Sequence, residues 1–280
     1  MSTPNHQATI LELLGKYFKK TLQPHQYQPI LTDLRRCHPE LLRDCLVEAV
    51  EATDKDPAAP PEEPSRAALM RIYNRKTKEM AAMFPFLMAT EGALRGQLAC
   101  EMYRIFGTDQ WWLPYCAALN SGKEFKDVTA INGVPVPGSK FSNSVGKIIM
   151  SINAKDGKNA ATITCGLEFL SEATFGQLRY LGEHSWAQIM QVFRGKKGDI
   201  PQIVKQDFIN LTKEILDMRN DLYHHRPISN QQKCVEACER LLDHFDHHLG
   251  AFDHAISQAV YVRPEFKVDR KPRHDIIVAV

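Results

Sequence analysis

The sequence predicts an all-α protein that carries one small β-hairpin insertion. Apolar residues recur at steps of three and four along most of the chain, which is the spacing that places them on one face of a helix. Segments rich in β-branched residues, with glycines and prolines beside them, gather only within residues 126–165, and this pattern favours a short hairpin there. The 280 residues are 44% apolar and 24% charged, so the chain is long and apolar enough to bury a core without disulfides.

Charge, hydropathy and cysteine content exclude several classes of protein. The net charge is only +2, so nucleic acid would have to bind a local basic patch rather than a strongly basic arm. The chain lacks the run of roughly 18 uncharged apolar residues that a membrane span needs, and its start lacks the compact apolar stretch of a signal peptide. The seven cysteines are scattered without a CxxC pair, which is typical of reduced thiols. We therefore expect a cytoplasmic protein that has no membrane partner.

Composition predicts four parts along the chain. Residues 1–52 form an N-terminal helical segment, because apolar residues recur there at helical spacing. Residues 53–66 are rich in proline, alanine and acidic side chains, which favours a linker. Residues 67–262 form the main helical domain, which contains an irregular insertion at 108–165. Residues 263–280 form a tail that is basic and then apolar.

The first half of the main domain is predicted to contain a long helix and a hairpin. Helical periodicity covers residues 66–105, where Pro85 should kink or restart the helix. Gly107 should end it, since glycine is the residue most often found just after a helix. The insertion carries three β-rich pieces that would pair as a hairpin, at residues 128–136, 147–153 and 160–165.

Two helices are predicted next. The first covers residues 166–181, with a break at Thr174. The second begins at the capping residue Asp199, has Pro201 near its first turn and stops at Pro227. Its apolar residues step by three and four and form one stripe, made of Phe208, Leu211, Ile215, Met218 and Leu222.

The last predicted helix is capped by Ser229 or Asn230 and continues through Phe252. Its second half is rich in histidine and aspartate, and His244 and His248 share a face because they are four residues apart. Such a pair is a candidate for metal binding on a helix. The alternative is a solvated polar face opposite the apolar stripe, and the lack of an HExxH pattern favours this alternative. We therefore predict no metal site.

Residues 218–227 carry the pattern that points to chemistry, with the sequence MRNDLYHHRP at the end of an apolar-faced helix. Histidine exchanges protons near neutral pH, and arginine offers a fork of donors that matches phosphate oxygens. We therefore predict a catalytic set for phosphodiester cleavage, consisting of Arg219, Asn220, His224 and His225. In this set imidazole moves protons, arginine stabilises charge on the phosphate and Asn220 orients an imidazole. This chemistry requires no metal and no cofactor.

The spacing of this motif adds a geometric condition. On a straight helix Arg219 and His224 point about 140° apart, so they converge within one chain only if the helix bends or ends there. A twofold axis between two copies offers a second way to bring an arginine of one chain near a histidine of the other. The alternative to chemistry is that arginine and histidine at this helix end simply complement the helix dipole.

Three segments resemble the Abi-like (abortive infection) proteins, which are members of the HEPN superfamily. RNDLYHHRPI, residues 219–228, is similar to the RNxxxHH signature of that family. Residues 71–98 are similar to its basic helix followed by an IExxxR pattern, with Glu91 and Arg95 on the last two positions of that pattern. GLEFLSEATFGQLRYL, residues 166–181, is similar to the family's segment around a TFG triplet.

The resemblance implies a HEPN-type helical bundle that forms a homodimer with a composite active site. It implies a metal-independent endoribonuclease that acts in anti-phage abortive infection or in toxin-type defence, with RNA as substrate and an antitoxin or another defence-system protein as partner. His224, or His225 in its place, would be the acid or base, Arg219 would hold the phosphate and Asn220 would orient the pair. The alternative class is a catalytically silent RNA-binding or RNA-guided module of a defence system.

Basic and aromatic residues near the motif are the predicted RNA contacts. They are Arg95, Tyr223, Arg226, Arg194, Lys196 and Lys197. Trp111, Trp112 and Tyr115 offer a further platform on which bases could stack. The alternative for these three is packing in the core or in a dimer interface, and their large apolar area favours it.

Overall fold

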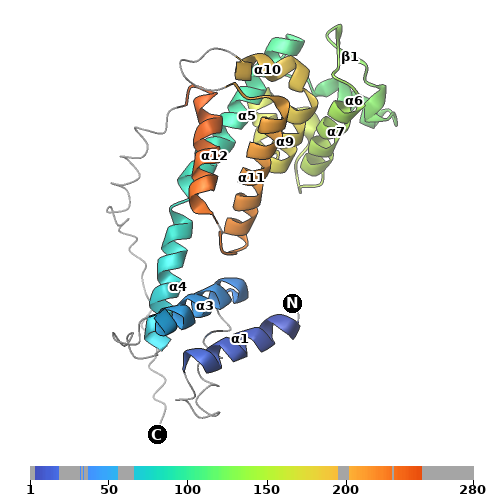
Figure 1. Ribbon diagram of the computed structural model, residues 1–280. Helices are drawn as coiled ribbons and strands as arrows, with labels where there is room; N and C mark the ends of the chain where they lie inside the picture. The colour runs from blue at the N-terminus through green and yellow to red at the C-terminus, as the bar shows by residue number, and fades with distance from the viewer. Residues whose placement is uncertain are drawn as a thin grey trace, which may run out of the picture. The chain divides into compact units, whose positions relative to one another are not determined.

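The structure is a computed structural model that describes residues 4–18, 32, 34, 37–55, 66–194, 202–228 and 230–247. The described residues are mostly helical with one small hairpin, which confirms the predicted fold class (Figure 1). The α-helices are α1 (Pro4–Tyr17), α3 (Pro39–Lys55), α4 (Arg66–Ala81), α5 (Phe84–Phe106), α6 (Leu113–Asn120), α7 (Ser139–Asn153), α8 (Gly166–Ser171), α9 (Phe175–His184), α10 (Trp186–Arg194), α11 (Lys205–Tyr223) and α12 (Gln231–Asp243). The shorter elements are the 3-10 helices η1 (Phe125–Asp127) and η2 (Ala160–Thr162) and the strands β1 (Ala130–Ile131) and β2 (Val134–Pro135).

The first three described helices pack in sequence order, α1 against α3 and α3 against α4. Their core side chains are almost completely buried and include Leu14, Leu42, Leu46 and Leu69. Polar contacts add to this packing, since the ammonium group of Lys76 on α4 lies 2.5 Å from the carboxylate of Asp44 on α3. α3 continues to Lys55 and α4 begins at Arg66. The described ends of the predicted linker are therefore helical, and the rest of that linker lies outside the described residues.

The predicted break and end of the long helical stretch are both confirmed. α4 stops at Ala81 and α5 starts at Phe84, with Pro85 in its first turn, where a proline costs no hydrogen bond. α5 ends at Phe106, and Gly107 follows in the left-handed conformation with φ 64°. The N–H of Gly107 donates to the carbonyl of Tyr103 at 2.8 Å, which satisfies one of the last carbonyls of the helix.

Replacing Gly107 by alanine is expected to lower the free energy of unfolding by about 1–2 kcal/mol, because a residue with a Cβ is strained in that conformation. Gly92→Ala is the matched control. Gly92 lies exposed within α5, with open space where the new methyl group would be, so alanine there should stabilise the protein by about 0.5–1 kcal/mol. Urea unfolding of the three proteins measures both changes, and equal stability of wild type and Gly107→Ala would contradict this account of the helix end.

The predicted hairpin is confirmed at one of its three pieces and wrong at the other two. Residues 130–135 form it, with Ala130 opposite Pro135 and Ile131 opposite Val134. Residues 147–153 belong to α7 instead, and residues 160–162 form η2. The buried side chains of α7 recur at helical steps and include Phe141, Val145, Ile148, Ile149 and Ile152. Over this longer window the helical periodicity outweighs the β preference of the isoleucines.

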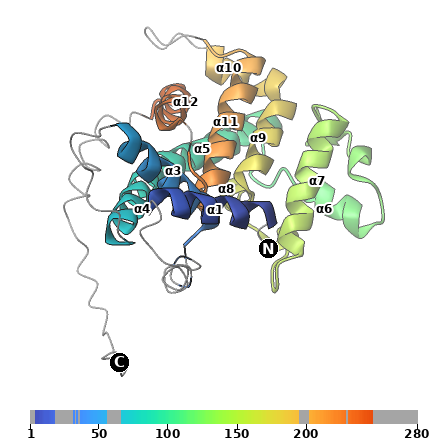
Figure 2. The same ribbon diagram turned by 60° about the horizontal axis from the view of Figure 1, so that its bottom comes forward.

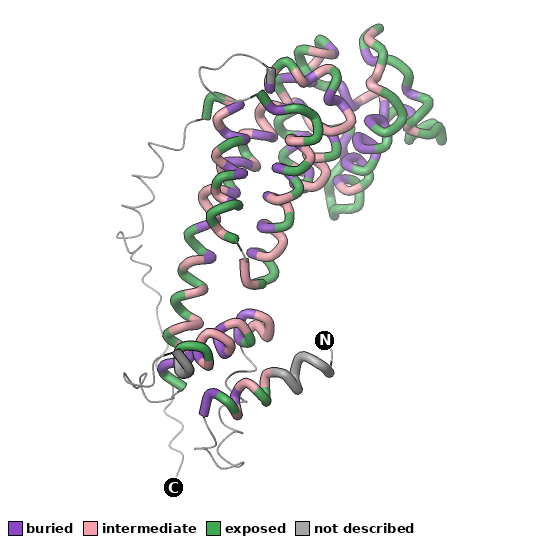
Figure 3. The backbone as a smooth tube through the Cα atoms, in the orientation of Figure 1, coloured by how far each residue is buried: buried purple, intermediate pink, exposed green. Residues whose placement is uncertain are grey.

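The aromatic residues that follow α5 lie in the core rather than at the surface. Trp111, Trp112 and Tyr115 are each 0% exposed. Figure 3 colours the buried residues of the chain purple. The ring of Trp112 stacks on that of Phe169, with centroids 4.5 Å apart and planes 5° apart. Its indole N–H donates to the carbonyl of Ala160 at 2.9 Å. This confirms the packing alternative and excludes these side chains as an RNA-stacking surface.

The second half of the chain forms a row of helices in which α9 lies between α7 and α11, and α11 lies between α9 and α12 (Figures 1 and 2). The predicted start of α11 at Asp199 is wrong, because the first helical residue is Lys205. The carboxylate of Asp207 accepts a hydrogen bond from the N–H of Val204 at 3.2 Å, and a negative charge in the first turn suits the helix dipole. Asp199 and Pro201 lie outside the described residues.

The predicted break at Thr174 and the predicted cap Asn230 are both confirmed. The hydroxyl of Thr174 accepts from the N–H of Gln177 at 3.3 Å and begins α9. The side chain of Asn230 accepts from the N–H of Lys233 at 2.9 Å and begins α12. Both are hydrogen bonds that satisfy a donor in the first turn of a helix. α12 is shorter than predicted, because the chain turns immediately after Asp243.

Candidate functional site

The predicted catalytic residues lie around the C-terminal end of α11. Arg219 and Asn220 belong to its last turns, and the helix ends at Tyr223. His224 is the capping residue, with φ −95° and ψ 10°, and its N–H donates to the carbonyl of Asn220 at 3.0 Å. The side chains of His224 and His225 are both exposed. The helix therefore ends within the motif, before Pro227, and presents two adjacent imidazoles at the surface.

His225 holds an uncommon backbone conformation, with φ 52°. Residues other than glycine rarely adopt it, although histidine does so more often than most. The turn is stabilised by two backbone hydrogen bonds, from the N–H of His225 to the carbonyl of Leu222 at 3.2 Å and from the N–H of Arg226 to that of Asp221 at 2.7 Å. Local strain of this kind gathers at functional sites, so the turn itself marks this helix end as a candidate.

A third imidazole joins the two from the start of α3. The ring centroid of His38 lies 6.1 Å from that of His225, and the N–H of His38 donates to the hydroxyl of Tyr73 at 3.2 Å. Glu40 follows on α3 and lies 3.3 Å from Arg226. Sequence reasoning missed His38 because it lies in the N-terminal segment, where a single histidine before a helix carries no distinguishing signal.

The surroundings of His38 favour its neutral form. Burial lowers the pKa of His38 most, Glu40 raises it, and the neighbouring side chains of His225, Arg226 and His224 lower it further. Its Nδ1 atom is buried and has no hydrogen-bond partner among the described residues. A neutral imidazole beside two exposed ones is suited to accept a proton at neutral pH.

The pKa of His38 predicts how stability depends on pH. The unfolded chain binds a proton on His38 more readily than the folded protein, so the free energy of unfolding should fall as pH drops from about 7 to 5. This contribution to stability is fully present above the ordinary histidine pKa and is lost as the pH falls through the lowered pKa of the folded protein. The slope is at most about 1.4 kcal/mol per pH unit for one proton. Urea unfolding of wild type and His38→Asn at several pH values should show the steeper fall in wild type. Parallel curves would contradict the assignment.

Glu91 on α5 connects two arginines that the sequence placed in separate motifs. Its carboxylate accepts from Arg95 at 2.8 Å and from the Nε atom of Arg219 at 3.3 Å. Arg95 also donates to the carbonyls of Leu170 at 2.9 Å and Ala173 at 3.4 Å. Arg95 thus holds α5 to the end of α8 and to the segment after it, and it forms an ion pair with Glu91 one turn away on the same helix. That Arg95 contacts RNA stays a prediction.

Arg219 is held against Tyr223 rather than against the histidines. Its guanidinium lies 4.6 Å from the centroid of the Tyr223 ring, and that ring meets Phe84 of α5 edge-on with centroids 5.6 Å apart. Tyr223 nonetheless remains 54% exposed. No hydrogen bond joins the side chain of Arg219 to that of Asn220 or His224, although all three belong to the described residues. The end of the helix therefore does not by itself bring Arg219 and His224 into contact within one chain.

The structure describes the side chains of only some of the remaining predicted RNA contacts. Arg226 is exposed and lies 3.3 Å from Glu40 and 3.9 Å from Asp221. Burial raises the pKa of Asp221, and the positive charge of Arg226 opposes this shift. The side chains of Arg194, Lys196 and Lys197 lie outside the described residues. Of the predicted contacts, only Tyr223 and Arg226 are described as exposed beside the two histidines.

The histidines of the last helix do not form a metal site in the part of the chain that the structure describes. His244 is 1% exposed, and its ring centroid lies 5.9 Å from that of Phe193. Across the described residues, no group of three or more His, Cys, Asp or Glu side chains is arranged to hold a metal ion. His248 lies outside that part. None of the described helices is both long and apolar enough to cross a bilayer.

Comparison of the chain with protein-family models, with curated proteins and with solved structures found no match. The resemblance to the Abi-like proteins therefore rests on the three sequence segments alone. In the structure those segments fall on α4 and α5, on α8 and α9, and on α11 with its C-terminal turn. The contacts of Glu91, Arg95 and Arg219 join all three.

Proposed function

We propose that this protein is a metal-independent endoribonuclease of the Abi-like kind, with its catalytic centre at the C-terminal end of α11. The observation that carries the proposal is the gathering of three imidazoles, those of His38, His224 and His225, beside Arg226 at this helix end. Segments far apart in the sequence supply them. Phosphodiester cleavage by acid and base requires one group that accepts a proton and a second that donates one, and imidazole can do either.

The proposed reaction uses the ribose 2′-hydroxyl as an internal nucleophile. A neutral imidazole takes the proton of that hydroxyl, the oxygen attacks phosphorus, and the bond to the 5′-oxygen of the next nucleotide breaks. His224 gives a proton to that leaving oxygen, so the products carry a 2′,3′-cyclic phosphate and a 5′-hydroxyl. His38 is the proposed base, because its surroundings lower its pKa and favour the neutral imidazole. The need for a 2′-hydroxyl would make the enzyme specific for RNA.

Arg219 is the proposed phosphate ligand. Its Nε atom donates to Glu91, while its two terminal nitrogens form no hydrogen bond with any described residue, so they are free to bind an anion. Oriented by Glu91 and Tyr223, the guanidinium would lose little freedom on binding phosphate. Asn220 remains the proposed orienting residue.

A homodimer would supply the contact between arginine and histidine that one chain does not make. Around a twofold axis, Arg219 of one copy faces the histidines of the other in the proposed composite site. Exposed apolar side chains support this, since Tyr223 beside Arg219 is 54% exposed, and Met88, which precedes Glu91 by three residues on α5, is 71% exposed. We place the enzyme in the cytoplasm in anti-phage or toxin-type defence, with RNA as substrate and an antitoxin or other defence protein as partner.

The test is cleavage of 5′-labelled total RNA in excess EDTA by wild type and by the double variant Arg219→Ala/His224→Ala. We expect wild type to cut RNA but not the matching DNA, and to leave cyclic-phosphate ends. The double variant should bind RNA without cutting it. Loss of wild-type cutting in EDTA, or equal cutting by both proteins, would reject the proposal.

A second candidate function is RNA binding without cleavage. It is favoured by the engagement of Arg219 with Glu91, which leaves the arginine and His224 unpaired with each other in one chain. In the same experiment it predicts a wild type that never cuts under any condition and a double variant that has lost RNA affinity.

A further inference from the structure

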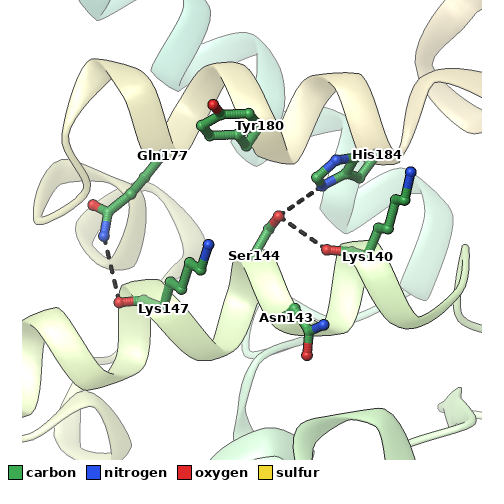
Figure 4. Close-up of a pocket in the computed structure, with 7 residues that line it drawn as sticks. All are labelled: Lys140, Asn143, Ser144, Lys147, Gln177, Tyr180 and His184. Carbon is green, nitrogen blue, oxygen red and sulfur yellow. Dashed lines mark hydrogen bonds between the residues drawn. The ribbon is translucent and has the colours of Figure 1, made fainter.

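A polar pocket of about 370 Å³ lies between α7 and α9, on the side of α9 away from α11 (Figure 4). This volume falls within the range of small-ligand sites, roughly 300–1,000 Å³. α7 contributes Lys140, Ser144 and Lys147, and α9 contributes Gln177, Tyr180 and His184. None of these residues belongs to the proposed catalytic site.

The lining residues form one polar face on each helix. Lys140, Ser144 and Lys147 are spaced by four and three residues, so they lie along one side of α7. Gln177 and His184 are seven residues apart on α9, with Tyr180 between them. Two packed helices usually meet through apolar side chains, and here polar side chains line a cavity at their contact.

Hydrogen bonds fix the inner wall of this pocket. The hydroxyl of Ser144 donates to the carbonyl of Lys140 at 3.0 Å and lies 2.8 Å from Nδ1 of His184. The hydroxyl of Ser144 and Nδ1 of His184 share one hydrogen bond, which ties α7 to α9. Burial lowers the pKa of His184 most, and Lys140 and Lys205 lower it further against Glu183. Burial and the two lysines therefore favour the neutral form of His184.

The pocket has uncompensated positive charge. Lys140 and Lys147 are both exposed, and neither forms an ion pair with a carboxylate in the described part of the chain. Figure 4 shows both side chains extending from α7 toward α9. Lys155 and Lys158, in contrast, are both paired with a carboxylate, that of Glu172. Two free ammonium groups at one cavity are suited to phosphate.

Aromatic surface lies beside these charges. Tyr180 is 46% exposed. Its ring centroid lies 5.9 Å from that of the His184 imidazole and 4.9 Å from the guanidinium carbon of Arg179. Its hydroxyl forms no hydrogen bond with a described residue. A ligand that joins phosphate to a planar ring would use both features, since aromatic side chains beside basic ones are the common way to hold a nucleotide.

We propose that the pocket between α7 and α9 binds one nucleotide, with its phosphate at Lys140 and Lys147 and its base or sugar against Tyr180. The nucleotide is either free or part of an RNA strand, because the recognised chemistry is the same. This site is additional to the proposed ribonuclease centre and does not depend on it, because the two share no residue.

The test measures binding of AMP and of a 2′-O-methyl RNA 12-mer, which has no free 2′-hydroxyl and so cannot be cut, by titration calorimetry. The double variant Lys140→Ala/Lys147→Ala should weaken binding at least tenfold. The control, Lys78→Ala/Lys123→Ala, removes the same charge from two exposed lysines elsewhere and should change affinity less than twofold. Binding of AMP would identify a free nucleotide as ligand, and binding of the 12-mer alone would identify RNA.

Two results would overturn the proposal. One is a wild type that binds neither probe, and the other is equal weakening by both lysine pairs, which would indicate unspecific charge. Tyr180→Ala separates the aromatic contact from the phosphate contact. It should weaken AMP at least fivefold but leave inorganic phosphate unchanged, and an unchanged affinity for AMP would remove the base contact from the proposal. Circular dichroism checks that each variant is folded.

Discussion

Replacing His224 by alanine is expected to lower the rate constant of RNA cleavage about 10²- to 10⁴-fold, which is the usual contribution of a positioned acid or base. The side chain of His224 is exposed, so the free energy of unfolding should change by less than about 0.5 kcal/mol. Single-turnover cleavage of a labelled RNA in EDTA measures the rate, and urea unfolding measures the stability. A large loss of rate without loss of stability would place the chemistry at the end of α11.

Two further variants sharpen this result. His247→Ala removes another exposed imidazole, outside the proposed site, and should leave the rate unchanged within twofold. His225→Asn keeps a residue that tolerates the left-handed conformation at φ 52°, and it should lower the rate less than tenfold. If His225→Asn lost more activity than His224→Ala, the role of acid would pass to His225. Equal rates in wild type and His224→Ala would remove this residue from the reaction.

Trp112→Ala is expected to lower the free energy of unfolding by about 3–5 kcal/mol, the usual cost of removing a buried aromatic side chain. Trp112 is 0% exposed, and the variant loses both its stacking on Phe169 and its hydrogen bond to Ala160. Such a loss is a large part of the stability of an ordinary domain. Urea unfolding followed by circular dichroism measures it.

The control for this prediction is Tyr103→Ala. Tyr103 lies on α5 and is 56% exposed, so its removal should cost less than about 0.5 kcal/mol. Trp112→Phe should fall between the two, because phenylalanine keeps the stacking and loses the hydrogen bond. A Trp112→Ala protein that is stable but has lost RNA affinity would instead return this residue to a surface role.

The sequence predicted those parts of the fold that depend on neighbours in the chain. The restart at Pro85, the helix end at Gly107, the break at Thr174 and the cap Asn230 are local features, set by backbone geometry and by side chains within one turn. The strand predicted at residues 147–153 is wrong, because the β preference of a few isoleucines is a weaker signal than the periodicity of a whole helix. The apolar positions of the whole of α7 repeat at helical spacing, and burial of that stripe decides the element.

Local signals alone could not predict where α11 starts. An aspartate followed by a proline in the first helical turn is a strong signal for a helix start. Asp199 and Pro201 therefore predict a start at Asp199. The described helix instead starts at Lys205, where Asp207 bonds back to the N–H of Val204. Both aspartates fit the local rule. Packing of Phe208 against Trp186 and Phe193 lies just beyond the second start, and such tertiary contacts choose between two starts of similar local quality.

By itself the sequence determined that the chain is helical and that Arg219, His224 and His225 lie around one helix end. Only the tertiary structure decided that His38 joins those histidines, that Glu91 holds Arg219, and that the tryptophans after α5 are buried. Periodicity and capping report interactions within a few residues of the chain. Contacts between residues far apart depend on how whole helices pack against one another, and no local pattern specifies that packing.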